Sequence, residues 1–360
     1  MGKHKTIMLL TTYKCNLRCS YCYEPKIANF SLTVPKAKSI IEEQLSSIGD
    51  SYDSVEIQFM GGEPLLQFPL IQEVSEWLWT KPLNKHLMVL FAPTNGTLLT
   101  YEMKKWFYKN RNRFNLGLSF DGNTDMQNAN RSESFKYVDL EFFSNTWPEQ
   151  NVKMTISPNT VDKLSSGVIF LHNRGFKFIS ADLAMGDNVM WTKSHLITFK
   201  TELNKLSDFY MSNPNLIPFS MLRLNVARLG VGHKKTLKTC SCGEDMICVD
   251  WNGKTYACHL FSPIALSIEK ATASNILYNF ANHDQFISQE CRSCALCGLC
   301  NRCCGMNYIC NGDVAKPSAF HCSAFKILFV ANCRFTMRKA SNAQDWQLLR
   351  QIQNIINAIA

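Results

Sequence analysis

The sequence predicts an α/β protein with a partial, open (β/α)6 barrel, followed by a small cysteine-rich domain with a β-hairpin and by a C-terminal helix. Up to about residue 225, apolar strand-like runs alternate with amphipathic helical runs, which is the pattern of a parallel sheet with right-handed crossovers. Beyond that point, thirteen of the sixteen cysteines lie between Cys240 and Cys333. We therefore expect a barrel over residues 1–228, a cysteine-rich domain over 229–335 and a helical tail over 336–360.

Six short runs rich in apolar and β-branched residues are the expected strands. They are Thr6–Thr12, Val55–Met60, Leu87–Ala92, Phe114–Phe120, Val152–Ser157 and Phe176–Ala181. Helical periodicity predicts the segments that follow them, at Pro35–Ser47, Leu70–Trp79, Thr100–Lys109, Phe135–Asn145, Val161–Asn173 and Lys193–Met211. In such sheets the chemistry lies at the C-terminal ends of the strands.

The composition excludes several classes of protein. The 360 residues, 46% of them hydrophobic, are enough for substantial cores, and no apolar run approaches the roughly 18 residues of a membrane span. The run Ile7–Leu10 is too short for a signal-peptide core. We therefore expect a cytoplasmic protein whose cysteines serve metal or redox chemistry. The formal charge of +9 counts every thiol as neutral, and thiols that bind metal as thiolates would lower it. We expect neither a nucleic acid nor a membrane as partner.

A group of three cysteines follows the first expected strand. Cys15, Cys19 and Cys22 have the spacing CxxxCxxC. A 4Fe–4S cluster is normally held by four thiolates, so three would leave one iron open to an outside molecule, and we interpret the loop as catalytic. For this spacing alone, a zinc site with a distant fourth ligand or a redox thiol pair is the alternative.

The residues between these cysteines favour the catalytic interpretation. The run Cys15–Glu24, with Tyr21 directly before the last cysteine, resembles the signature loop of the radical S-adenosylmethionine (SAM) enzymes. The resemblance implies a TIM-like radical SAM barrel in which the open iron binds the amino and carboxylate groups of SAM. It also implies that reductive cleavage of SAM gives a 5′-deoxyadenosyl radical, which takes a hydrogen atom from the substrate.

Three further motifs follow expected strands and resemble motifs of the same family. Gly61-Gly62-Glu63-Pro64 resembles its GGEP motif, whose backbone meets the SAM amino group, and glycine allows that close approach. Thr94-Asn95-Gly96 resembles its TNG turn. Ser119-Phe120-Asp121-Gly122 resembles its S-x-D-G motif, in which the serine and the aspartate lie near the SAM ribose and carboxylate. The first motif alone also fits an ordinary strand-to-helix turn.

Two further SAM contacts are implied by position, and one family feature is absent. Asn159 follows the fifth expected strand, where the family often has a polar ribose contact, and Arg223 is a candidate partner of the SAM carboxylate. The alternative for such single residues is a turn former or a surface charge.

Relatives often continue S-x-D-G with a His-Asp pair and an arginine. Here Met126–Arg131 keeps Arg131 but has two amides in place of the pair, so an acid–base role of that pair is not expected.

A β-hairpin is expected in the second half of the chain. Asn252-Gly253 is a strong hairpin signal, and it lies between the runs Ile247–Asp250 and Thr255–Cys258. The hairpin folds Cys248 back near Cys258. Its register stays open, because a slip of one residue would exchange the two faces.

This half resembles the SPASM domain of radical SAM enzymes. Its pattern is a cysteine, a glycine-xxxx-cysteine, CxxC-x5-CxxxC and a last cysteine, and the chain matches it from Cys242 to Cys322. The resemblance implies two auxiliary 4Fe–4S clusters. Cluster one would be held by Cys242, Cys248, Cys258 and Cys304, and cluster two by Cys291, Cys294, Cys300 and Cys322.

Rival assignments of these cysteines stay open. Cys294, Cys297, Cys300 and Cys304 also fit the bacterial ferredoxin run, apart from Gly305 where proline is expected. Zinc fits any site of four thiolates. The cysteines left over by the SPASM pattern are Cys240, Cys297, Cys303, Cys310 and Cys333, and buried packing is the usual role of a free cysteine.

The resemblance also implies a peptide or protein substrate and a small redox partner, a flavodoxin or a ferredoxin. One branch of the family oxidises a Cys or Ser of sulfatases to formylglycine, and there an aspartate after the glycine-xxxx-cysteine acts as base. Here His259 follows Cys258, which is closer to the Cys-His-x-Phe of maturases that form thioether or carbon–carbon cross-links in ribosomally made peptides. We therefore expect oxidative cross-linking of a precursor peptide. The alternatives are sulfatase maturation and, in another class, a non-catalytic Fe–S electron-transfer or zinc-scaffold protein.

The last segment, Ala343–Ile359, has apolar residues near helical spacing. We expect an amphipathic helix that packs back on the body of the protein. A helix that docks a partner is the exposed alternative.

Overall fold

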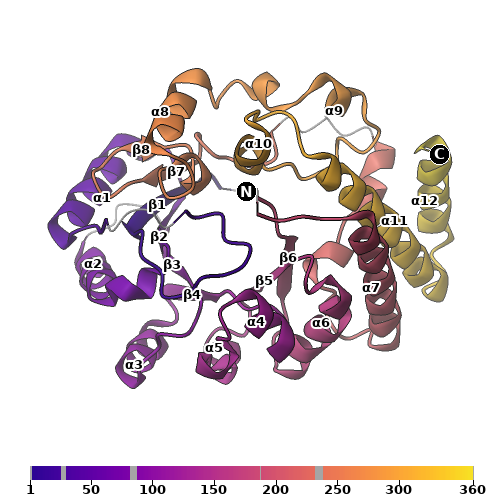
Figure 1. The fold of residues 1–360 in the computed structure, drawn as a ribbon, viewed down its shortest axis with the longest axis horizontal. Coiled ribbons are helices and arrows are strands. Elements are labelled where there is room, and N and C mark those ends of the chain that lie inside the picture. The colour runs from indigo at the N-terminus through magenta and orange to yellow at the C-terminus, as the bar shows by residue number, and fades with distance from the viewer. Residues whose placement is uncertain (1, 26–29, 82–86, 187, 232–237, 360) are drawn as a thin grey trace. The chain divides into compact units, whose positions relative to one another are not determined.

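The computed structural model describes residues 2–25, 30–81, 87–186, 188–231 and 238–359, and Figure 1 labels its helices and strands. Contacts between residues divide the chain into two compact units, and each is described by itself. Unit one consists of Met1–Phe120, Arg131–Gln150 and Ser241–Asn282. Unit two consists of Asp121–Asn130, Asn151–Cys240 and His283–Ala360.

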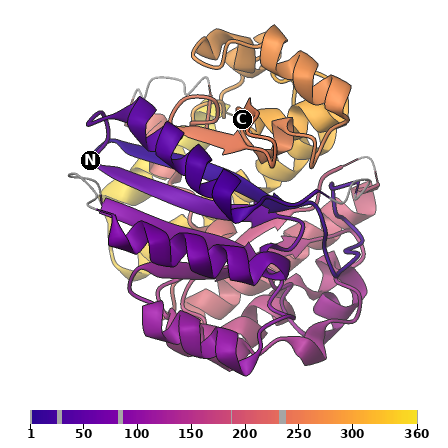
Figure 2. The ribbon, with the colours of Figure 1, turned by 90° about the vertical axis from the view of Figure 1, so that its left-hand side faces the viewer.

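Unit one is built on a six-stranded sheet with the order β4-β3-β2-β1-β7-β8. The strands are β1 His4–Thr12, β2 Ser54–Gly61, β3 Leu87–Thr94, β4 Phe114–Leu118, β7 Met246–Val249 and β8 Thr255–Tyr256. All neighbours from β4 to β7 are parallel, and β8 runs antiparallel to β7. Figure 2 shows the N-terminal strands of this sheet side by side.

Burial along the strands explains why these segments form the centre of unit one. In β1 every side chain from Lys5 to Thr12 is buried, as expected for a parallel strand that is covered on both faces. In β2 burial alternates, and Val55, Ile57 and Phe59 are fully buried. The helices of this unit are α1 Val34–Ile48, α2 Phe68–Thr80, α3 Tyr101–Asn110, α5 Leu140–Thr146 and α8 Ile268–Leu277.

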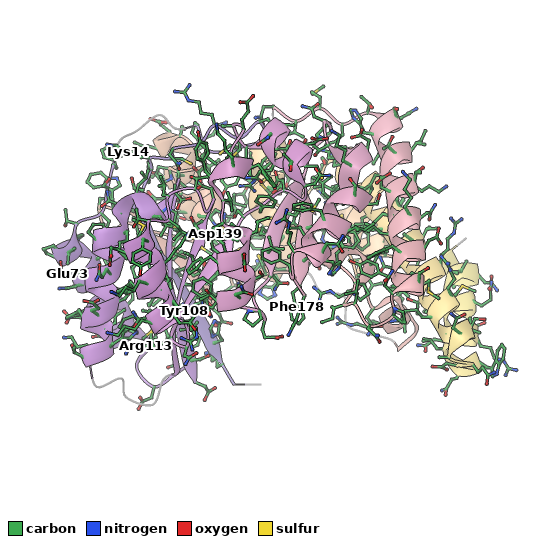
Figure 3. The ribbon with its side chains drawn as sticks, turned by 90° about the horizontal axis from the view of Figure 1, so that it is seen from below. Lys14, Glu73, Tyr108, Arg113, Asp139 and Phe178 are labelled. Atoms are coloured by element: carbon green, nitrogen blue, oxygen red, sulfur yellow. The ribbon has the colours of Figure 1, made fainter. Side chains whose placement is uncertain are left out.

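The two ends of the parallel strands in unit one can be followed in Figure 3. Lys14 lies just after the C-terminal end of β1, and Arg113 lies just before β4, and the view places their labels at opposite ends of the strands. Because β1 to β4 are parallel, their C-terminal ends all lie on the side of the sheet where Lys14 lies. The cysteine loop, the GGEP turn and the TNG turn all begin on this side of the sheet.

Unit two holds a second parallel sheet with the strands β5 Val152–Ile156 and β6 Ile179–Leu183. Its helices are α4 Thr124–Asn130, α6 Leu164–Asn173, α7 Lys193–Ser212, α9 Gln289–Ser293, α10 Cys304–Asn311, α11 Ala319–Asn342 and α12 Trp346–Ile359. Among the described residues, no helix combines the length and the apolar character needed to cross a membrane.

The predicted α/β class is confirmed, with strands and helices alternating from β1 to α7. Two elements differ in their boundaries. The helix expected over Phe135–Asn145 is a short 3-10 turn, Phe135–Tyr137, followed by α5 from Leu140, and the strand expected from Phe176 begins at Ile179. Gly175 has a φ of 86°, and the Phe176 amide donates to the Leu171 carbonyl at 3.2 Å. These residues therefore belong to the turn that ends α6.

The C-terminal tail forms the expected helix, α12. Gln344, with a φ of 56°, interrupts the helical backbone between α11 and α12. Ile352 and Ile355 of α12 lie in a buried apolar cluster with Phe325 and Phe329 of α11. The expected packing of the tail on the body is confirmed within unit two.

The hairpin β7-β8 is also confirmed, and its register is now defined. Cys248 pairs with Tyr256, and Val249 pairs with Thr255. Contacts place this hairpin in unit one, because β7 pairs with β1. The domain boundaries expected at residues 228 and 335, which follow the sequence motifs, remain a prediction.

Candidate active site

The loop that carries Cys15, Cys19 and Cys22 starts directly after β1. All three thiols are half-buried. The Cys22 amide donates to the Cys19 carbonyl at 3.1 Å, and the Leu17 amide lies 3.5 Å from the Cys15 sulfur. Leu17 is buried and anchors the middle of the loop. The structure thus holds three cysteines on one short turn that keeps contact with solvent.

The two glycines after β2 let this strand end lie against the start of the cysteine loop. The amide of Gly62 donates to the Thr12 carbonyl at 3.0 Å. A Cβ on Gly61 would collide with the Thr12 carbonyl oxygen, and a Cβ on Gly62 would lie 2.5 Å from that of Lys14. Both positions therefore require glycine for the close approach of two backbones.

Glu63 joins the GGEP turn to the TNG turn. Its buried carboxylate accepts hydrogen bonds from the Leu65 amide (3.0 Å), the Thr94 hydroxyl (2.8 Å) and the Asn95 amide (2.8 Å). Burial raises the pKa of Glu63 to about 7, although these hydrogen bonds and the charge of Arg131 oppose the shift. The side chain thus fixes the turns after β2 and β3. The prediction that Glu63 belongs to the SAM site stays untested.

Asn16 ties the cysteine loop to the TNG turn, a role that the sequence analysis missed. Its side-chain oxygen accepts from the Asn95 side-chain amide at 2.9 Å, and its own amide donates to the Thr97 hydroxyl at 2.8 Å. Asn95 also accepts from the Thr97 backbone amide at 3.0 Å. The only available signal was an amide next to Cys15, and amides are common in loops.

The segment around Arg131 contacts the same loop from another part of unit one. The Arg131 guanidinium lies 5.5 Å from the centre of the Tyr21 ring, within the range of a cation–π contact. The Arg18 amide donates to the Ser132 hydroxyl at 2.9 Å. Ser119 is half-buried beyond β4, and its amide donates to the Thr94 carbonyl at 2.8 Å.

Asp121 is fully buried in unit two and is engaged by protein donors. Its carboxylate accepts from the Asn130 side chain at 3.1 Å and from the Thr155 amide at 2.9 Å. Its backbone amide donates to the Gln127 side-chain oxygen at 2.8 Å. Gln127 and Asn130 are amides of the stretch that departs from the family pattern. They hold the S-x-D-G aspartate in place without adding charge.

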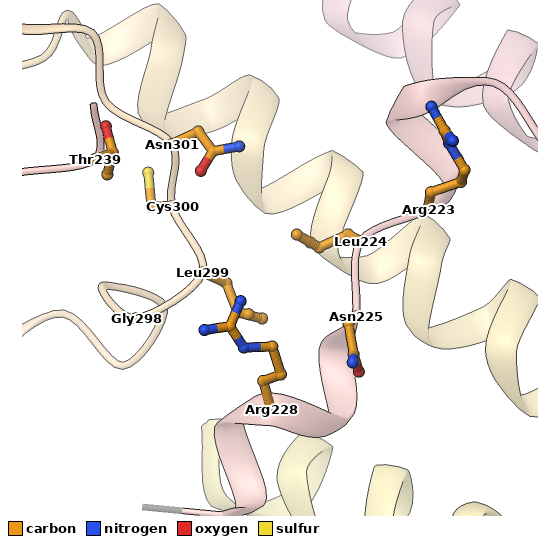
Figure 4. A pocket seen from close by; sticks show the side chains of 9 residues that line it. All are labelled: Arg223, Leu224, Asn225, Arg228, Thr239, Gly298, Leu299, Cys300 and Asn301. Carbon is orange, nitrogen blue, oxygen red and sulfur yellow. The ribbon is translucent and has the colours of Figure 1, made fainter. Parts of the chain in front are cut away.

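The two weaker candidates for SAM contacts are exposed residues of unit two. Asn159 follows β5, next to the buried Thr160. Arg223 lines a pocket of about 380 Å³ together with Arg228 and Cys300. Figure 4 shows the Arg228 side chain directed toward Leu299 and the Arg223 side chain directed away from Cys300. Both assignments remain predictions.

The hairpin β7-β8 is attached directly to β1 and to the cysteine loop. Cys248 pairs with Met8 of β1, and the Tyr13 hydroxyl donates to the buried Asp250 carboxylate at 2.8 Å. The rings of Phe30 and Trp251 are stacked with centroids 4.5 Å apart. The two regions that carry Cys15–Cys22 and Cys248 therefore pack as one substructure.

Two candidate ligands of cluster one, Cys248 and Cys258, are buried on this hairpin and directly after it. Burial raises the pKa of the Cys248 thiol, and the nearby Asp250 carboxylate adds to the shift. Neutral thiols buried in this way become metal ligands only by losing their protons. Cys242 also belongs to unit one and Cys304 to unit two, so this ligand set remains a prediction.

His259 directly follows Cys258 and is half-buried. Burial lowers the pKa of this imidazole to about 4. Its ring centroid lies 6.0 Å from that of Tyr23, which follows Cys22. Among the described residues, Nδ1 of His259 has no hydrogen-bond partner. The side chain is thus a neutral polar group beside the cysteine loop.

The four candidate ligands of cluster two lie near one another in unit two. Burial raises the pKa of Cys300 to about 12; the charge of Arg302 opposes this shift, and the thiols of Cys322, Cys291 and Cys294 add to it. Burial likewise raises the pKa of Cys322, and Cys291 and Cys294 add to that shift. This set of four thiols fits a four-thiolate centre.

Two left-over cysteines of unit two have specific neighbours. Cys297 is buried, and the Arg302 guanidinium lies 3.2 Å from its carbonyl oxygen and 3.7 Å from its sulfur. Cys240 and Cys304 have their sulfurs within 4.8 Å of each other. Nothing in the spacing of the sequence had connected Cys240 to a candidate ligand.

The matches with known proteins agree with this arrangement. Residues 3–139 match a family model described as a 4Fe-4S single cluster domain. A cysteine-type anaerobic sulfatase-maturating enzyme of Clostridium perfringens is 23% identical over 88% of this chain and 92% of its own length. A GTP 3′,8-cyclase of Staphylococcus epidermidis is 23% identical over 58% of this chain and 63% of its own length.

Solved structures show the same fold. The structure of anSMEcpe with bound AdoMet has a TM-score of 0.67 and 18% identity, over 94% of this chain and 99% of that one. Streptococcus suis SuiB bound to the precursor peptide SuiA has a TM-score of 0.60 and 14% identity, over 89% and 76%. Together with the cysteine loop and the turns assembled around it, these matches support the resemblance of this chain to the radical SAM enzymes.

Proposed function

We propose that this radical SAM enzyme modifies a peptide and forms a thioether or carbon–carbon cross-link in it. The observation that carries the proposal is the attachment of the hairpin to the cysteine loop through Tyr13, Asp250 and the β1–β7 pairing. A radical generated at the loop would then arise next to the hairpin and His259. The matching structures of anSMEcpe with a bound peptide and of SuiB with its precursor peptide support a peptide substrate.

We assign the following roles to residues of the chain. Cys15, Cys19 and Cys22 hold the cluster that binds SAM, and the turns fixed by Glu63 and Asn16 shape the site around it. The cofactor-binding residues we propose beyond the cysteines are Tyr21, Gly61, Gly62, Glu63, Asn95, Ser119, Asp121, Asn159 and Arg223. When bound, SAM and the clusters supply a hydrogen-abstracting radical and an acceptor for one electron.

The overall balance of the proposed reaction is simple. One electron from the reduced redox partner would cleave SAM into methionine and the 5′-deoxyadenosyl group, which would take one hydrogen atom from the peptide and leave as 5′-deoxyadenosine. Closing the new bond would then release one proton and one electron, which auxiliary cluster one would take up and pass to a small redox protein, a flavodoxin or a ferredoxin. The product is two hydrogens lighter than the peptide.

Residue His259 favours cross-linking over formylglycine formation. In the sulfatase-maturating branch an aspartate in this place acts as base, whereas His259 is a half-buried imidazole whose pKa is lowered to about 4. A specific observation favours the second candidate, sulfatase maturation, because the Clostridium perfringens relative carries that activity in its name and aligns along 88% of the chain.

The test uses the anaerobically reconstituted enzyme with SAM and a reductant. We expect 5′-deoxyadenosine, and mass spectrometry of a peptide encoded beside the enzyme and co-expressed with it should show the loss of two hydrogens and resistance to thiol reductants. A sulfatase-type peptide in the same assay should give no aldehyde. Aldehyde trapped by a hydrazide would replace cross-linking with sulfatase maturation, and an absence of SAM cleavage would favour a non-catalytic Fe–S or zinc protein.

A further inference from the structure

We propose that His321 is a positioning residue of cluster two, which raises its reduction potential by donating a hydrogen bond to the sulfur of Cys300. Buried Arg302 assists through its charge. This inference rests on the ligand set proposed above for cluster two. It assigns a role to two residues that neither the sequence motifs nor the family resemblance had singled out.

The geometry around His321 holds its ring against the cysteine. Nε2 of His321 lies 3.5 Å from the Cys300 sulfur. The backbone amide of His321 donates to the hydroxyl of Ser318, the residue that caps α11, at 3.2 Å. The imidazole ring also lies nearly parallel to the Phe325 ring, at an interplanar angle of 12°. The helix cap fixes the backbone of His321, and the Phe325 ring lies beside the imidazole with the two centroids 6.5 Å apart.

The direction of the hydrogen bond follows from the chemistry of the partner. A cysteine that binds iron is a thiolate and has no proton to donate. The contact between Nε2 and sulfur can therefore be a hydrogen bond only if the imidazole carries its proton on Nε2. Hydrogen bonds to the sulfur ligands are among the features that set the potential of Fe–S clusters.

The position of Cys322 adds to this arrangement. Cys322 directly follows His321 in the first turn of α11, a helix of 24 residues, and its amide donates to the Ser318 carbonyl at 3.2 Å. The positive end of the helix dipole thus lies beside a candidate ligand. This end of the helix favours negative charge at cluster two.

Arg302 contributes a second positive group from the loop before α10. It is buried, with 5% of its surface exposed, and its charge acts on the thiols of Cys300 and Cys322. A buried cation is stabilised by a nearby anion. Four thiolates around a 2+ core sum to −2, and one-electron reduction takes the sum to −3. His321 and Arg302 both stabilise the more negative state, so both raise the potential.

The experiment is an anaerobic redox titration followed by electron paramagnetic resonance. It uses the full chain with Cys15, Cys19 and Cys22 changed to Ala, so that only the auxiliary clusters contribute signals. In this background His321→Phe removes the donor and keeps a ring beside Phe325. We expect unchanged iron content and, for one cluster, a midpoint potential that is lower by up to about 59 mV. For a one-electron couple this shift is a tenfold change in the ratio of oxidised to reduced forms.

Two further variants separate hydrogen bonding from packing. His321→Gln restores a side-chain donor and should return most of the potential. Phe325→Leu changes the packing without removing the donor and should leave the potential near its original value. An unchanged potential in His321→Phe, loss of the cluster from it, or an equal shift in Phe325→Leu would each overturn the proposed role of His321.

Cys322→Ala tells whether a failure lies in the inference or in the ligand set. We expect this variant to lose about four iron atoms, since a 4Fe–4S cluster needs its four thiolates. If Cys322→Ala loses iron while His321→Phe keeps the original potential, the ligand set of cluster two is supported and the proposed role of His321 is wrong. If Cys322→Ala keeps all its iron, the ligand set of cluster two itself is wrong, and the inference falls with it.

Discussion

The loop of Cys15–Cys22 and the loop of Cys291–Cys300 both gather thiols, but the chain surrounds them with different groups. The first loop is held by the neutral amides of Asn16 and Asn95. The buried ionisable groups near it are one acid, Glu63, and one base, Arg131. The second loop has the buried cation Arg302 and the imidazole of His321 beside its sulfurs.

This difference follows the number of thiols. Three thiolates around a 2+ core sum to −1, whereas four sum to −2. A cluster with four thiolates at the second site would carry the larger negative charge, which a buried cation and a hydrogen-bond donor stabilise. At the first site, three thiolate ligands would leave one coordination position for SAM, so shape and access would matter more than charge. Each prediction below changes one side of this comparison.

The largest effect should come from changing Cys15, Cys19 and Cys22 together to Ala. If these residues are the only protein ligands of the SAM-binding cluster, about eight of about twelve iron atoms should remain, in the two auxiliary clusters. Formation of 5′-deoxyadenosine, measured by chromatography after reduction with SAM present, should stop completely. Continued SAM cleavage in this variant would refute the assignment of the open site to the first loop.

The second prediction compares Cys300→Ala with Cys297→Ala. Cys300 has three thiols near it, whereas Cys297 is buried against the Arg302 guanidinium. We therefore expect Cys300→Ala to lose about four iron atoms, as one cluster is lost, and Cys297→Ala to keep all of them. The measurement is iron per chain after reconstitution and gel filtration.

The contrary result would identify a different cluster. Iron loss from Cys297→Ala would favour the ferredoxin-like set of Cys294, Cys297, Cys300 and Cys304. Zinc in place of iron in purified protein would make the second half a structural metal domain.

Local sequence patterns were enough to predict the strands β1 to β6, most of the helices between them, the hairpin and the last helix, but not α11 Ala319–Asn342. Strand β1, for example, is a continuous apolar run that is buried along its length, and Asn252-Gly253 marks the turn between β7 and β8. The pairing of β7 with β1 could not be predicted, because it joins residues about 240 positions apart and neither strand encodes its partner. It also changes which residues pack together, so that the hairpin joins the first unit.

The same limit applies to the site. The cysteines and the glycine pair have a spacing or a backbone requirement that a sequence reveals. Asn16, Arg302 and His321 have neither, since an amide, a guanidinium and an imidazole are common residues whose roles here depend on distant neighbours. Glu63 lies between these cases, because its motif was visible but the three donors that engage its carboxylate were not.

The smallest effect we predict concerns the charge of Glu63 and its dependence on pH. The pKa of an unfolded glutamate is about 4.3, and burial raises that of Glu63 in the folded protein to about 7. The folded state therefore holds this proton more tightly than the unfolded state. The stabilisation is fully present below about pH 4.3 and is lost as the pH rises to about 7, by roughly 3 kcal/mol in the free energy of unfolding.

Glu63→Gln removes this titration, so the difference in stability between the two proteins isolates it. Anaerobic thermal unfolding from pH 5 to pH 8 should show the wild type losing stability relative to Glu63→Gln up to about pH 7 and no further change above it. Thr94→Val sharpens the test, because the Thr94 hydroxyl donates to Glu63 and lowers its pKa. Without that hydroxyl the ionised carboxylate is less stabilised, so the loss should extend to higher pH. A difference that stays constant from pH 5 to pH 8 would show that Glu63 is ionised throughout, so that its negative charge would accompany the positive charge of Arg131 at every pH tested.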